Sequence, residues 1–225
     1  MAAPRRSPRT KPVANPAAGK TSAKNPGTAR APRAPRADAI RNRERILAAA
    51  CDLFTEVGSQ APIDEVARRA GIGNATVYRH FPDREALVLG VVQHVLKRTG
   101  DRAEQAIAEV EDPFGALSRF VHACAEERIG AVCVVLDGAY DPGEAEVATL
   151  TGRLNALVEA MMARARRAGT LRCDVDLGDI ILAVSQLTRP LPDLAGYHRG
   201  PHRYLQLFLD GLRAPAASTL PADDM

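Results

Sequence analysis

The chain has 225 residues, of which 46% are hydrophobic, and its formal net charge is +3. This length and composition can bury the core of one large domain or two small ones without a disulfide framework. Four cysteines with no C-x-x-C pair favour a reducing compartment over a secreted scaffold. No apolar run approaches the ~18 residues of a membrane-spanning helix and no signal peptide is evident, so we expect a cytoplasmic protein without a membrane partner.

The positive charge is concentrated at the N-terminus. Residues 1–37 contain nine basic and no acidic residues, whereas the rest of the chain contains 21 basic and 27 acidic residues. The segment is rich in proline, alanine, serine and threonine, and it holds too little apolar surface to offset the entropy of ordering. We expect a disordered basic tail whose charge favours a polyanionic partner. A tail that only keeps the protein soluble is the alternative.

Helical periodicity begins after this tail, with Asp38 as a suitable N-cap. The first expected helix ends at Gly58, and its apolar face consists of Ile46, Ala50, Leu53, Phe54 and Val57. A second, short helix starts near Pro62 and ends at Gly71, and its apolar face consists of Ile63, Val66, Ala67 and Ala70. Both helices therefore have one side to bury.

A third helix is expected from Asn74, which can cap it, to about His80. Pro82 interrupts the pattern, and Asp83 can cap a longer fourth helix. Two short helices joined by a three-residue turn containing glycine form a helix-turn-helix. The small Ala67 suits their close approach, and the residues expected to face inward are Val66, Ile72 and Val77.

The other face of the third helix bears hydrogen-bonding groups and no carboxylate. Its members are Asn74, Thr76, Tyr78, Arg79 and His80. Neutral polar and basic side chains suit the major groove of DNA, where base edges offer donors and acceptors and phosphates line the rim. The pattern indicates a recognition helix and a double-stranded DNA partner.

Three segments between residues 41 and 89 are more specific: RERILAAACDLF, IDEVARRAGIGNATVYRHF and PDREALV. Together they resemble the TetR family of transcriptional regulators. The resemblance implies an all-α chain of about nine helices, with an N-terminal helix-turn-helix DNA-binding domain and a C-terminal helical domain for effector binding and dimerisation. We accordingly expect these domains at residues 38–86 and 87–213, and a flexible C-terminal tail at 214–225.

The resemblance also implies which residues contact a DNA operator: Asn74, Thr76, Tyr78, His80 and Arg84. We expect Ala75 and Arg79 of the same helix to belong to this site as well. Tyrosine and histidine at these positions usually meet phosphates, and a basic residue like Arg84 commonly touches the DNA backbone. The chain departs from the family pattern at Ala61 and Pro62, where a threonine or serine hydroxyl usually caps the second helix and reaches a phosphate. Ala75 stands at a position where the family frequently has a glycine.

Beyond residue 100 the pattern stays helical, with apolar faces around residues 114–121, 147–165, 180–187 and 205–212. Residues 131–136 fit a short strand by periodicity alone, whereas the resemblance implies a helix. It further implies that the last two helices pair with those of a second copy to form a homodimer, and that a small-molecule effector binds between about residues 100 and 190. The expected effector-binding residues are Phe114, Phe120, His122, Tyr140 and Met161.

Other patterns point less clearly to chemistry. His122 and Cys124 lie two residues apart, so on a helix they point away from each other and do not pair as base and nucleophile. His198 and His202 have the spacing of a metal-binding pair, but a glycine and a proline between them favour a loop. We therefore expect no catalytic residues, no metal site and no cofactor, and we expect the cysteines to be inert buried thiols.

Three classes of function remain open at this stage. A repressor released from a palindromic operator by a small molecule fits the sequence best. A constitutive DNA-binding protein without an effector is the second class, and an enzyme on a helical scaffold is the third. Sequence-specific DNA binding that responds to a small molecule distinguishes the first class from the other two.

Overall fold

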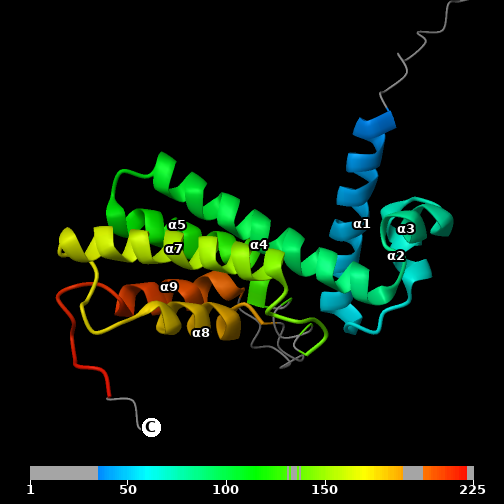
Figure 1. Cartoon of the computed structure of the whole chain (residues 1–225). Coiled ribbons are helices and arrows are strands. Elements are labelled where there is room, and N and C mark those ends of the chain that lie inside the picture. The colour runs from blue at the N-terminus through cyan, green and yellow to red at the C-terminus, as the bar shows by residue number, and fades with distance from the viewer. Residues whose placement is uncertain (1–34, 131, 133–135, 137, 190–199, 222–225) are drawn as a thin grey trace, which may run out of the picture. The chain divides into compact units, whose positions relative to one another are not determined.

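Figure 1 shows the chain as a computed structural model, which describes residues 35–130, 132, 136, 138–189 and 200–221. The described residues form eight α-helices and no strand, apart from one isolated bridge between Leu171 and Arg213. The helices are α1 (Pro35–Val57), α2 (Ile63–Ala70), α3 (Asn74–His80), α4 (Arg84–Glu109), α5 (Pro113–Glu126), α7 (Ala145–Arg167), α8 (Leu177–Leu187) and α9 (Pro201–Gly211). The all-α class is confirmed. Most of residues 131–136 and nearly all of the basic tail lie outside the described residues.

The first helix differs from expectation at both ends. It begins at Pro35 rather than at Asp38, whose carboxylate lies in the first turn and accepts a hydrogen bond from Arg41. The expected apolar face is buried, except that Val57 is 63% exposed. Val57 is the last helical residue, and Gly58 turns the chain with φ 94°, so the side chain of Val57 lies beyond the packed part of the face.

Side-chain caps explain where three later helices begin. The carboxylate of Asp83 accepts from the Ala86 amide at 2.7 Å, which confirms the expected cap of α4. Asp112 accepts from the Gly115 amide at 2.7 Å, immediately before a proline that suits the first turn of α5. Asp176 opens α8 with a capping box. These signals act over three residues, so they are visible in the sequence.

Two clusters of buried residues form the core, and α4 contributes to both. Leu87 and Val91 of α4 belong to the cluster shared with α1, α2 and α3, whereas Ala103 and Ala106 belong to the cluster shared with α5, α7, α8 and α9. Gly90 permits the closest contact, because a Cβ atom there would lie 2.6 Å from the ring of Phe81 at the end of α3. The start of α4 is thereby pressed against the helix-turn-helix.

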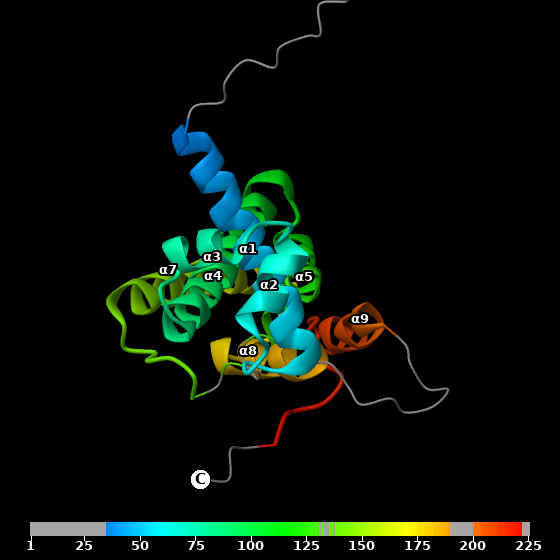
Figure 2. The same cartoon turned by 90° about the vertical axis from the view of Figure 1, so that its right-hand side faces the viewer.

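The remaining helices pack as a bundle. Helix α4 contacts both α5 and α7, α5 also contacts α9, and α8 contacts α9. In Figure 1, α8 and α9 lie side by side beneath α5 and α7, and Figure 2 shows α2 and α3 beside α1. None of the described helices is both long and apolar enough to cross a membrane. The bundle leaves one side of α8 and α9 without a neighbouring helix in the described chain.

Candidate functional site

The turn between α2 and α3 is fixed by backbone hydrogen bonds and by one arginine. Gly71 adopts the left-handed conformation (φ 64°, ψ 42°), which glycine tolerates without steric cost. Its amide and that of the following residue donate to the carbonyls of Arg68 and Ala67 at 3.1 Å each, the two hydrogen bonds of a Schellman motif. Arg45 of α1 donates to the Ala70 carbonyl, and its cation stabilises the C-terminal end of α2.

Helix α3 buries one side and presents the other to solvent. Val77 is completely buried against the core that contains Val66 and Ala67, as expected. The expected DNA-contacting residues on α3 are Asn74, Ala75, Thr76, Tyr78, Arg79 and His80, and each is exposed or half-buried. Tyr78 is 47% exposed although it is aromatic. The outer face of α3 is therefore polar, cationic and accessible to a large ligand.

Asn74 does not cap α3, contrary to expectation. Gly73 occupies the N-cap position, and no side chain caps the helix. The Asn74 amide instead donates to Asp64 Oδ1 at 2.6 Å, which ties α3 to α2. Arg84 likewise donates to the carbonyl of Ser59 at 2.7 Å and ties the start of α4 to the loop after α1. Both side chains therefore hold the helix-turn-helix together, and each carries further hydrogen-bonding atoms beyond those used in these contacts.

The start of α2 lacks a side-chain cap. Pro62 occupies its N-cap and makes no side-chain hydrogen bond, which agrees with the missing hydroxyl noted in the sequence. The first turn instead carries Asp64 and Glu65, whose charges favour a helix N-terminus. A phosphate at this end of α2 would meet these carboxylates, so α3 offers the more favourable contacts.

His80 is a titratable group at the expected DNA surface. Partial burial, followed by the nearby charges of Arg79 and Arg43, holds its pKa below the ordinary 6.5. The imidazole is therefore mostly neutral at pH 7 in the free protein. A phosphate beside it would favour the protonated form and raise its pKa.

DNA affinity is accordingly expected to rise as the pH falls from 7.5 to 6. A phosphate contact would give His80 a higher pKa in the complex than in the free protein, so binding would take up a proton as the pH falls. The affinity would then change by at most about tenfold per pH unit for each histidine. Fluorescence anisotropy with labelled operator DNA measures this dependence. His80→Gln should flatten it at constant ionic strength, and an unchanged dependence would show that His80 does not meet a phosphate.

A second candidate site is a cavity of about 200 Å³ among the C-terminal helices. Its described lining residues are Leu96, Thr99, Phe120, Cys124, Ile129, Tyr140, Thr151, Leu154, Asn155, Val158, Ile180, Ile181, Val184 and Ser185. They come from α4, α5, α7, α8 and the two connections around residues 129 and 140. The lining is mainly apolar, and none of these residues carries a formal charge at neutral pH.

The structure brings two of the five expected effector-binding residues to this cavity, Phe120 and Tyr140. Phe114 and Met161 are completely buried in the surrounding core instead. His122 lies outside the cavity, where its Nδ1 is 3.1 Å from Nδ1 of His202 on α9. Apolar periodicity alone does not distinguish a core side chain from one that borders a cavity.

Sequence reasoning missed the polar residues of the lining. Thr99 belongs to α4, Thr151 and Asn155 to α7, and Ser185 to α8, so no local motif joins them. The one available signal was the spacing of Thr151, Asn155 and Val158 at i, i+4 and i+7, which places them on one face of a helix. That spacing indicates a shared face without indicating what the face meets.

The end of α5 connects the cavity to the helix-turn-helix. Ile129 borders the cavity, and the preceding Arg128 forms an ion pair with Asp52 of α1 at 3.3 Å. Arg128 has a positive φ of 55°, a conformation that non-glycine residues seldom adopt. A Cβ atom on the next residue, Gly130, would lie 2.6 Å from the Ser185 carbonyl oxygen of α8. Consecutive residues here contact α1, the cavity and α8.

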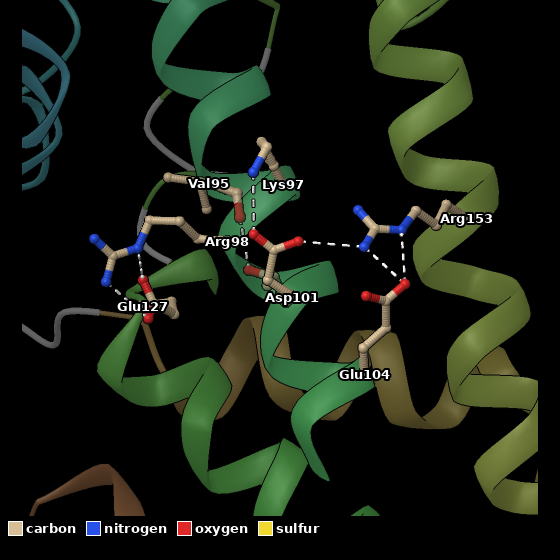
Figure 3. A network of polar contacts seen from close by, with 8 residues as sticks. Val95, Lys97, Arg98, Asp101, Glu104, Glu127 and Arg153 are labelled. Carbon is tan, nitrogen blue, oxygen red and sulfur yellow. Dashed lines mark hydrogen bonds and ion pairs between the residues drawn. The ribbon is translucent and has the colours of Figure 1, made fainter. Parts of the chain in front are cut away.

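Glu127 adds a connection to α4 (Figure 3). Its side chain is 6% exposed and accepts hydrogen bonds from Arg98 Nε at 2.6 Å and Arg102 Nε at 2.9 Å. Burial acts to raise the pKa of this carboxyl, but the hydrogen bonds from the two guanidinium groups outweigh burial and hold the pKa below its usual range. Glu127 is therefore ionised at neutral pH and anchors the end of α5 to α4.

The structure describes three of the four cysteines, and Cys133 lies outside the described residues. Burial raises the pKa of Cys51 to about 11, and Cys124 is buried, but Cys173 is exposed, contrary to the expectation that all thiols are buried. Of the two histidines for which a loop was expected, His198 lies outside the described residues, and His202 lies in the first turn of α9 instead. Within the described part of the chain, no group of three or more His, Cys, Asp or Glu side chains is arranged to hold a metal ion.

Comparison with known proteins places this architecture in a family. Residues 46–91 match the family model of bacterial regulatory proteins of the tetR family, and residues 112–214 match that of the SbtR-like transcriptional regulator C-terminal domain. An HTH-type transcriptional regulator of Staphylococcus aureus, SAB2452, is 44% identical over 62 residues, which cover 27% of this chain and 34% of that protein. The match to such curated relatives thus spans about a third of their length.

Solved structures extend the similarity to most of this chain and to nearly all of the chains that it matches. A TetR transcription regulatory protein from Mycobacterium vanbaalenii is 35% identical with a TM-score of 0.60, covering 79% of this chain and 98% of its own. The regulator SCO0520 from Streptomyces coelicolor is 30% identical with a TM-score of 0.59, covering 77% and 99% of the two chains. With its exposed polar α3, its helix-turn-helix and its C-terminal helical bundle, the chain belongs to the TetR family of transcriptional regulators.

Proposed function

We propose that the protein is a repressor that binds a palindromic operator as a homodimer and leaves it when a small-molecule effector occupies the cavity. The observation that carries this proposal is the junction at residues 127–130, where side chains that contact α1 and α4 lie next to one that borders the cavity. An occupant that displaces Ile129 also displaces Arg128, and with it the ion pair to Asp52 of α1. The DNA-binding helices and the cavity are thereby mechanically connected.

The proposed dimer uses the uncovered side of α8 and α9. Four large apolar side chains are exposed there: Ile181 (46%), Leu182 (63%), Tyr204 (37%) and Leu207 (59%). Such residues on two adjacent helices form an apolar surface that a second copy can bury. A C2 dimer would place two copies of α3 about 34–36 Å apart, one turn of DNA, or a multiple of that distance.

Release follows if the effector favours a different spacing of the two helices. A ligand shifts such an equilibrium only by its differential affinity for the two states, so the cavity must differ in shape between them. The structure of LfrR from Mycobacterium smegmatis, 20% identical to this chain, is a complex with proflavine. That likeness concerns the fold, so the proposal of an effector rests on the cavity of this chain.

Selection of bound sequences from a random DNA pool, followed by footprinting on the recovered site, tests the function. The expected result is a palindromic footprint that disappears when a cognate small molecule is added. Sequence-independent protection would instead indicate a constitutive DNA-binding protein, and turnover of a compound without DNA would indicate an enzyme. A chain that stays monomeric at micromolar concentration, with and without DNA, would contradict the proposed dimer.

The basic tail is proposed to strengthen DNA binding electrostatically. Each phosphate that it neutralises releases counterions and adds ~0.9 to the slope of log affinity against log salt. Deleting residues 1–36 should reduce this slope by roughly two to six units per dimer, since only some of the charges engage at once. It should weaken binding to operator and random DNA by similar factors. Salt titrations on both DNAs measure the slopes, and equal slopes with and without the tail would leave it only a solubilising role.

A further inference from the structure

We propose that the effector is an uncharged, largely apolar molecule smaller than a typical drug, and that its one polar group is hydrogen-bonded by Asn155. This inference rests on the proposed function, in which the cavity is the effector site. It adds the chemical class of the ligand and the residue that selects it. Three properties of the cavity carry it: the charge of its lining, the hydrogen-bonding state of its polar residues and its size.

The described lining of the cavity provides no counter-ion for a charged ligand. Its described lining residues have no formal charge at neutral pH, and charged side chains of α4 and α7 beside them are paired. Arg153 of α7 binds Asp101 and Glu104, and Arg98 binds Glu127, as Figure 3 shows. A buried ion without a partner costs several kcal/mol. A carboxylate or an ammonium group is therefore excluded from the cavity.

The polar residues of the lining differ in what they still offer to a ligand. The Thr99 hydroxyl already donates to the Val95 carbonyl of its own helix at 2.8 Å. Asn155 is half-buried, and its side-chain amide has no hydrogen-bond partner among the described residues. The amide offers two donors and an acceptor and can therefore bind a hydroxyl, carbonyl or amide group. Leu154 and Val158 flank it on α7, so the rest of the ligand meets apolar surface.

The volume limits the size of the ligand. At about 200 Å³ the cavity is smaller than the roughly 300–1,000 Å³ of sites that hold drug-sized molecules. An apolar protein cavity of about 150 Å³ is sufficient for benzene. The present cavity therefore suits a single ring, or a short branched chain, with one polar substituent.

A matched set of probes tests this class: toluene, benzyl alcohol, benzoate and benzylammonium, which share a ring and differ in polarity and charge. Isothermal titration calorimetry on the full-length protein gives their dissociation constants. We expect benzyl alcohol to bind most tightly and both ions to bind at least about tenfold more weakly, because neither ion finds a partner. An ion that binds as tightly as benzyl alcohol, or a series in which no probe binds, would overturn the inference.

Variants of α7 test the role of Asn155. Asn155→Leu should weaken the binding of benzyl alcohol by about threefold to tenfold, which is the effect of one lost hydrogen bond. The affinity for toluene should stay unchanged or increase. Asn155→Asp keeps the shape and should favour benzylammonium over the other probes. Thr149→Val, on the same helix but outside the lining, should change none of the four. Equal losses for toluene and benzyl alcohol in Asn155→Leu would show that Asn155 only packs.

Operator binding in the same samples separates the two proposals. Anisotropy with the selected operator should show sequence-specific binding by the wild type and by all three variants, because the substituted residues lie in α7, outside the helix-turn-helix. Sequence-specific operator binding together with a preference for a charged probe would refute the proposed ligand class but not the proposed function. If the wild type shows no sequence-specific binding to DNA, the proposed function itself is refuted.

Discussion

Replacement of Tyr78 by alanine is expected to weaken binding of the dimer to operator and random DNA alike. The side chain is 47% exposed on α3, and its hydroxyl is expected to bind a phosphate, which carries no sequence information. A hydrogen bond to a charged group contributes about 1.5–3 kcal/mol, and a dimer makes two. Tyr78→Phe, which removes only the hydroxyl, should reproduce most of the loss in anisotropy measurements at fixed salt.

Thr76→Ala is the matched comparison on the same helix. Its hydroxyl and methyl group are expected to meet a base edge, so its loss should cost about 1–3 kcal/mol and change the ranking of operator variants. Because Tyr78 lies on the exposed side of α3, its replacement should leave the free energy of unfolding within about 0.5 kcal/mol of the wild type. An operator complex in which both side chains point away from DNA would refute the assignment of α3.

Glu127→Ala should lower the free energy of unfolding by about 1–3 kcal/mol. Breaking a buried ion pair costs more in general, but Arg98 and Arg102 are 49% and 40% exposed, so water replaces part of the lost interaction. Urea unfolding measures the change. Wild type and variant must be compared at equal protomer concentration, because the stability of the proposed dimer depends on concentration. The control is Glu109→Ala: its ion pair with Arg119 is exposed on both sides and should contribute at most about 1 kcal/mol.

Acid should remove the contribution of Glu127. Its pKa in the folded protein lies below the ordinary 4.5, so the stabilisation is complete above pH 4.5 and is lost as the pH falls through the folded pKa. The difference in stability between wild type and Glu127→Gln should therefore be constant from pH 7 to about 5.5 and shrink below 4.5. A difference that persists unchanged under acid conditions would mean that shape, rather than charge, makes Glu127 stabilising.

The junction also predicts a functional consequence of the same change. If Glu127 and Arg128 connect the cavity to α1 and α4, Glu127→Gln should reduce the release of operator by a bound effector more than it reduces operator affinity itself. The comparison needs two titrations, one of DNA and one of effector at fixed DNA. An equal reduction of operator affinity and of effector-induced release would show that Glu127 only stabilises the fold.

The amino-acid sequence by itself determined the class of the fold and the character of the DNA-binding surface. Gly71 and Asp83 act on residues within one turn of the helix, so their effects follow from local geometry whatever the rest of the chain does. The polar face of α3 was also visible, because a short helix with Val77 buried must expose Tyr78 and Arg79. Family resemblance added the roles of these residues, which stay predictions until a complex with DNA is examined.

Only the tertiary structure decided which of the C-terminal side chains border the cavity. Phe114 and Phe120 lie on the same expected apolar face, yet one is locked in the core and the other lines the cavity. Apolar periodicity indicates that one side of a helix is shielded from water. It does not indicate whether that side packs in the core, borders a cavity or contacts a second protomer.

Pairings between distant residues were equally invisible in the sequence. Glu127 meets Arg98, 29 residues away, and His122 meets His202, 80 residues away. Asn74 was expected to cap its own helix and instead binds Asp64, because in the folded chain the neighbouring helix brings a carboxylate within 2.6 Å of its amide. Such contacts depend on where whole helices lie, which the spacing of residues along the chain does not specify.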